Sequence, residues 1–110
     1  MSYDAWMQID TGGSEKACVD DIGNMTSNVS PMWTKALGFR LRDLQDKLGA
    51  DCVPHLLRAV QHIRAPENRA DYEAMNPSNG WGNHAHATEF LEKLLSACER
   101  HPKAELHFWY

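Results

Sequence analysis

The two ends of the chain carry the alternating pattern of β-strands, which constrains how the residues between them can fold. In residues 3–9 apolar or aromatic side chains alternate with Asp, Trp and Gln, and residues 104–110 show the same period of two. Such a period is typical of a strand with one buried face. In the last strand, His107 and Trp109 are then expected to face solvent. Because a glycine-rich turn follows the first strand, residues 16–22 can return beside it as a hairpin.

The residues between the strands have apolar positions three and four apart, which indicates helices. Ser30 is expected to be the N-cap of a short helix, since a proline follows it. Asp51 is expected to cap a longer helix, and further helices are expected over about 67–75 and 83–101. This order predicts a single α+β domain over residues 1–110: a small antiparallel sheet, made of the N-terminal hairpin plus the C-terminal strand, packed against three to four helices.

Composition and charge limit the classes of function. The 110 residues are 43% hydrophobic and 24% charged, as expected for one globular domain with one core. The formal net charge is −4 without a basic run, which disfavours duplex nucleic acid because that affinity is mainly electrostatic. Neither a membrane span nor a secretory signal is present, so we expect a cytoplasmic protein with no membrane partner. Three widely spaced cysteines indicate buried reduced thiols rather than disulfides.

Two polar segments carry the candidate ligand-binding residues. Residues 24–30 precede the short helix, and residues 76–82 form a loop that holds an indole beside amide and hydroxyl groups. Each has a structural alternative, the first as a strand-to-helix connection and the second as a loop whose tryptophan packs into the core. If the two segments meet in space, they form a pocket of donors, acceptors and stacking faces. Its residues would be Asn24, Thr26, Asn28, Trp33, Ser78, Asn79 and Trp81.

No catalytic or metal-binding pattern accompanies these segments. The sequence has no nucleophile elbow, zincin helix, P-loop or dinucleotide glycine fingerprint. His84 and His86 are two residues apart on a predicted helix and therefore point in different directions. Cys52 and His55 have no second pair at ligand spacing to complete a tetrahedral set. We therefore expect a binding protein without enzymatic activity, cofactor or metal.

The same residues resemble a family. The run Ile22-Gly23-Asn24-Met25-Thr26-Ser27-Asn28-Val29 ahead of Met32-Trp33 is similar to small proteins encoded by phages and prophages, including those of actinobacteria. The loop Pro77-Ser78-Asn79-Gly80-Trp81-Gly82, followed by a Phe-Leu helix, belongs to the same likeness. The resemblance extends over nearly the whole chain. It implies a phage source and a compact fold, and it assigns no activity.

By analogy, the resemblance implies a sponge: a phage-encoded, non-enzymatic protein that binds a nucleotide-like small molecule, such as a host immune signal, in the host cytoplasm. The alternative is an interaction protein that blocks a host protein through its aromatic C-terminal strand, Phe108-Trp109-Tyr110. That strand, if placed at a sheet edge, would expose backbone groups without a protecting charge after Glu105. We therefore also expect a homo-oligomer, as a two-fold dimer.

Overall fold

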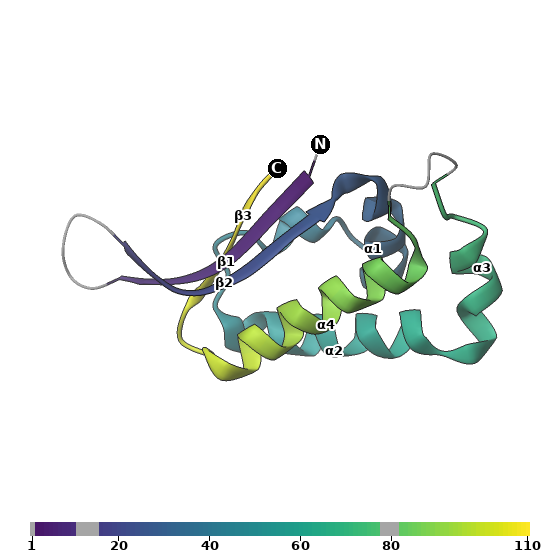
Figure 1. Cartoon of the computed structure of the whole chain (residues 1–110). Helices are drawn as coiled ribbons and strands as arrows, with labels where there is room; N and C mark the ends of the chain where they lie inside the picture. The colour runs from purple at the N-terminus through teal and green to yellow at the C-terminus, as the bar shows by residue number, and fades with distance from the viewer. Residues whose placement is uncertain (1, 11–15, 78–81) are drawn as a thin grey trace.

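The computed structural model describes residues 2–10, 16–77 and 82–110, which form an α+β fold with helices on one side of a sheet (Figure 1). The elements are β1 (Ser2–Asp10), β2 (Lys16–Thr26), η1 (Ser27–Val29), α1 (Ser30–Leu37), η2 (Leu41–Leu44), α2 (Gly49–Arg64), η3 (Pro66–Asn68), α3 (Arg69–Glu73), α4 (His84–Arg100) and β3 (Glu105–Trp109). The predicted fold class is confirmed. In the described ranges, no helix is long and apolar enough to cross a membrane.

The sheet has the strand order β2-β1-β3, and both pairs are antiparallel. β1 lies in the middle, so the first and last strands are neighbours and the two ends of the chain lie side by side (Figure 1). β2 runs to Thr26, beyond its predicted end at Ile22, because residues 24–26 pair with the start of β1. Ile22 and Val19 are the extra residues at two register shifts, and such bulges hide the strand alternation in the sequence.

The core lies between the inner face of the sheet and the helices. Cys52 and Cys98 are buried free thiols within it, as expected. Cys18 contradicts that expectation, because it pairs with Gln8 on the face of the sheet turned away from the helices and is exposed. The strands contribute Tyr3, Ala5, Met7, Leu106 and Phe108 to the core, and α4 contributes Ala87, Phe90, Leu91, Leu94, Ala97 and Cys98.

The two helices with predicted caps begin differently from the expectation. Ser30 is the first residue of α1 rather than its N-cap, because the turn η1 leads directly into the helix. α2 begins at Gly49, ahead of the predicted cap Asp51. The Gly49 and Ala50 amides donate to the carbonyls of residues 104 and 102, at 2.7 and 2.9 Å. Carbonyls of a distant backbone segment therefore accept hydrogen bonds from the amides at the start of α2, whereas the sequence predicted that the Asp51 side chain would cap this helix.

The outer edge of β3 is covered by the segment that leads into α2. The Leu106 amide donates to the Lys47 carbonyl, and its carbonyl accepts from the Asp46 amide, both at 2.9 Å. Beyond it, the Phe108 amide donates to Gln45 Oε1 at 2.7 Å. The expectation of self-association depended on an uncovered edge, and this edge is covered as far as Phe108. The structure therefore removes that reason for a dimer.

Candidate functional site

Trp33 belongs to the core and does not line a surface site. Its side chain has no exposed surface, and its indole N–H donates to the Ala87 carbonyl at 3.2 Å. Its ring contacts Phe90 and Tyr3, with centroids 5.2 and 5.3 Å apart. The prediction that Trp33 offers a stacking face to a ligand is therefore wrong, because this side chain points from α1 into the core, toward Tyr3 of β1 and Phe90 of α4.

The remaining described residues of the predicted site lie in two different places. The Asn24 amide group donates to Asp4 Oδ1 at 2.7 Å and to Ser2 Oγ at 3.0 Å, across the strand pair β1–β2. Thr26 Oγ1 accepts from the Asn28 amide at 3.3 Å and so helps to close η1. Asn24 therefore links two strands, while Thr26 and Asn28 stabilise a turn.

The second half of the predicted site, Ser78, Asn79 and Trp81, lies outside the described residues. The described end of that loop does reach the first polar segment. A Cβ placed on Gly82 would lie 2.7 Å from Thr26 Cγ2 and 2.8 Å from Val29 Cγ1. The two polar segments thus approach each other at Thr26 and Gly82, as the sequence analysis required of a shared pocket.

A pocket is present beside α1, on residues that the sequence analysis did not select. It has a volume of about 440 Å3, and we call it the arginine pocket. Gly38 ends α1 with φ +86, so the chain turns back and brings two arginines alongside the helix. The lining residues are Tyr3, Ser30, Pro31, Thr34, Arg40, Leu41 and Arg42.

The charge of the arginine pocket is positive. Arg40 has one ion pair, with Asp43 at 3.7 Å, and both side chains are largely in solvent. Arg42 lies over the ring of Tyr110, 5.4 Å from its centroid, and none of the described carboxylates pairs with it. Pro31 has no amide, and the Ser30 amide is bonded to the Ser27 carbonyl. The helix start therefore supplies few free amides, so an anion would depend on the arginines and on hydroxyl groups.

Aromatic rings border the same pocket. Tyr3 stacks on Tyr110 with centroids 5.4 Å apart, and Tyr110 is 51% exposed. Burial raises the pKa of Tyr3, although the nearby Arg42 opposes this shift. The Tyr3 hydroxyl is therefore neutral at physiological pH and is not a base there.

A second pocket, of about 380 Å3, lies where α2 and η3 meet the start of α4. It also contains two arginines, Arg64 and Arg69. Each is already paired with a glutamate, Arg64 with Glu92 at 3.7 Å and Arg69 with Glu73 at 2.7 Å. Less positive charge is left for a ligand here, so the arginine pocket is the better anion site.

His107 is the only strongly buried polar residue in the described part of the chain, although the strand pattern predicted that it faces solvent. Trp6 stacks on its ring, with centroids 5.9 Å apart. Asp46 Oδ1 lies 3.0 Å from Nδ1, and Glu105 Oε1 lies 3.1 Å from Nε2. The two carboxylates contact opposite nitrogens of one ring and so anchor the imidazole. One ligand atom from each of Asp46, Glu105 and His107 lies within 4.8 Å of the others, so these three side chains could also hold a metal ion.

The arginine pocket has only a faint signal in the sequence, the pair Arg40 and Arg42 shortly after the helix-ending Gly38. Nothing in the sequence shows that Tyr3 and Tyr110, at opposite ends of the chain, meet beside that pair. The ends meet because β1 and β3 are neighbours in the sheet. Comparison of this chain with protein-family models, curated proteins and solved structures found no match.

Proposed function

We propose that the protein binds a small phosphate-bearing molecule of the nucleotide-like class in the arginine pocket and leaves it chemically unchanged. The observation that carries this proposal is the meeting of Arg40 and Arg42 with the hydroxyl-bearing residues Ser30 and Thr34 around one pocket. Guanidinium groups bind phosphate oxygens through charge-assisted hydrogen bonds, and hydroxyl groups add further donors. Tyr110, which is half exposed and lies against Arg42 and Tyr3, provides an aromatic surface beside the charge.

The composition of the pocket supports binding without chemistry. Its described lining has no carboxylate, histidine or cysteine to serve as a base or a nucleophile. The one titratable group besides the arginines is Tyr3, and burial keeps its hydroxyl protonated. The resemblance to phage-encoded proteins extends the proposal one step further, to a sponge that withdraws a nucleotide-derived signal of the host.

Thermal-shift and calorimetric titrations with cyclic dinucleotides, cyclic mononucleotides and ADP-ribose derivatives test this function. A ligand at about 100 times its dissociation constant should add roughly 2.7 kcal/mol of stability. The corresponding nucleosides, which lack phosphate, should give no shift. Chromatography of the recovered ligand should show it intact.

Variants locate the site. Arg40→Gln and Arg42→Gln should each weaken binding by roughly 10-fold or more, because a hydrogen bond to a charged group contributes about 1.5 to 3 kcal/mol. Arg64→Gln and Arg69→Gln make the same charge change at the second pocket and should leave binding unchanged. No shift across the panel, or a shift that only the second pair of variants removes, would show that the arginine pocket is not the site.

A further inference from the structure

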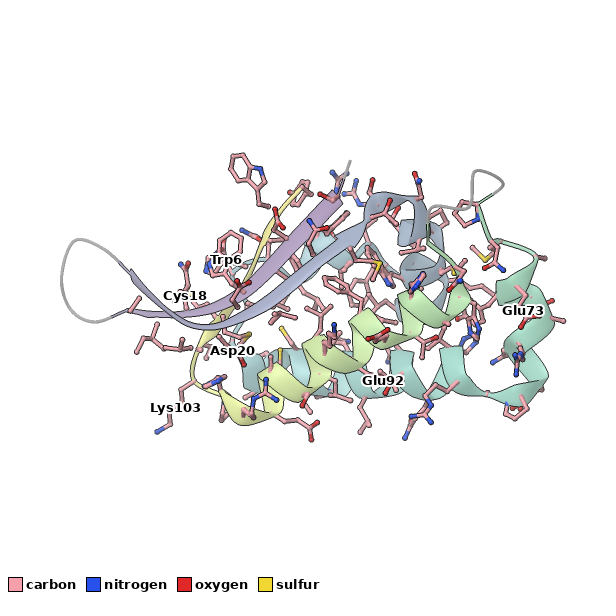
Figure 2. All side chains as sticks on the ribbon, in the orientation of Figure 1. Trp6, Cys18, Asp20, Glu73, Glu92 and Lys103 are labelled. Carbon is pink, nitrogen blue, oxygen red and sulfur yellow. The ribbon has the colours of Figure 1, made fainter. Side chains whose placement is uncertain are left out.

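The face of the sheet turned away from the helices carries chemistry opposite to that of the arginine pocket. We call it the outer face. Figure 2 shows Trp6 on this side, whereas Asp20 lies on the side of α4, where it pairs with Arg100 at 2.7 Å. The strand register places the outer-face residues in three cross-strand rows: Asn24, Asp4 and Trp109; Asp21, Trp6 and His107; Cys18, Gln8 and Glu105.

Two tryptophans give the outer face its aromatic surface. Trp109 is 72% exposed, more than any other large hydrophobic residue in the described structure. Trp6 is held in place, because it stacks on His107 and its indole N–H donates to Gln8 Oε1 at 2.8 Å. The His107 ring packs beside Trp6 on the neighbouring strand, so Trp6 needs little ordering to bind a partner. Trp109 lies on the same strand as His107.

The outer face is also acidic. Asp4 and Asp21 are exposed on it, and Glu105 lies at its edge. Asp4 accepts a hydrogen bond from the neutral Asn24 amide, and among the described residues neither aspartate pairs with a cation. The side chains described on the strands of this face include no lysine or arginine. Among the side chains that the structure describes on this face, none neutralises the charge of Asp4 or Asp21.

We propose that the outer face docks a basic polypeptide segment, one that presents lysine or arginine side chains in an extended conformation. A cation over the face of a tryptophan is attracted by the ring quadrupole, and the aspartates add charge complementarity. The two tryptophans and the two aspartates spread over about 7 Å along β1 and about 10 Å across the three strands. One small cation cannot contact both tryptophans and both aspartates over this area, whereas alternate side chains of an extended segment can.

The partner lies on the face of the sheet and does not extend it from β3. At the outer edge of β3, Asp46 and Lys47 already bond to the Leu106 carbonyl and amide, and Gln45 bonds to the Phe108 amide. The bulges of β2 distort the opposite edge, which makes regular strand addition there unfavourable. The affinity for the peptide therefore depends on side chains of the outer face and not on backbone pairing, so side-chain substitutions can test the proposal.

Fluorescence anisotropy with a labelled peptide that has arginine at alternate positions measures this docking. A peptide of the same length with citrulline, the neutral isostere, in place of arginine should bind far more weakly. Trp109→Ala should reduce affinity about fivefold, and Asp4→Asn with Asp21→Asn should reduce it by a similar factor. Asparagine keeps an oxygen acceptor for Asn24, and circular dichroism checks that each variant is folded.

The matched control is the pair Glu67→Gln and Asp71→Asn, which removes the same charge from exposed positions on η3 and α3. This control should retain the affinity of the unmodified protein. Equal losses in the two charge variants would overturn the proposal, since net charge alone would then explain binding. The proposal would also be overturned by equal affinity for the citrulline peptide, or by no binding of the arginine peptide at physiological salt. Trp109-dependent binding of a neutral oligosaccharide instead of the peptide would overturn it as well.

Discussion

The substitution Gly49→Ala should destabilise the protein, although helix propensity alone predicts the opposite. Gly49 is the first residue of α2, and its φ is not in the left-handed region, so alanine can adopt the backbone conformation. Replacing a helical glycine by alanine is normally favourable by up to about 1 kcal/mol. In this fold a Cβ at residue 49 would lie 2.5 Å from the His101 carbonyl oxygen and 2.8 Å from that of Cys98.

Both contacts are with backbone atoms at the end of α4, so no side chain can rotate away. The start of α2 and the end of α4 must separate, which strains the hydrogen bonds from residues 49 and 50 to residues 104 and 102. Overpacking of this kind costs about 1 to 3 kcal/mol, and two main-chain contacts this short place Gly49→Ala near the upper end. After the propensity gain is subtracted, we expect a net loss of about 2 kcal/mol.

Thermal and urea unfolding monitored by circular dichroism measure this loss. A net cost of about 2 kcal/mol should lower Tm by roughly 8 °C in a domain of this size. Ala50→Gly, at the next position, measures the propensity difference without a new contact and should cost at most about 1 kcal/mol. A Gly49→Ala protein as stable as the unmodified chain, or more stable, would refute the close packing of the start of α2 against the end of α4.

Two further substitutions test the core and the sheet edge. Burial raises the pKa of Tyr72 to about 12, so the unfolded chain loses the proton first and stability should fall as pH rises from about 10 to about 12. Tyr72→Phe should reduce this alkaline loss in urea titrations, and at neutral pH it should cost about 1 kcal/mol through the lost 2.6 Å hydrogen bond to His62. An unchanged alkaline slope would contradict the burial of this hydroxyl. Gln45→Ala leaves the Phe108 amide without its acceptor and should cost about 1 to 2 kcal/mol. Because it opens the β3 edge, it should also raise the mass measured by light scattering, and an unchanged mass at high concentration would show that Gln45 does not protect this edge.

Local sequence patterns determined the fold class. The period of two in residues 3–9 and 104–110 and the three-to-four spacing of the apolar residues in α2 and α4 all correspond to observed elements. These patterns are reliable because burial of one face sets the period directly. The end of β2 was missed because two bulges shift the register, and the start of α2 was missed because its amides bond to a segment more than fifty residues away in the chain.

The candidate sites were decided by tertiary structure. The sequence alone marked Trp33 as a possible stacking surface and His107 as solvent-facing, yet α1 turns Trp33 into the core and Trp6, Gln45 and Asp46 enclose His107. The arginine pocket exists because β1 and β3 are neighbours and Gly38 reverses the chain, which brings Tyr3, Arg40 and Arg42 together. Residue type shows what a side chain can bind, but only the packing of distant segments determines which side chains share a surface, since that packing depends on contacts that no local period encodes.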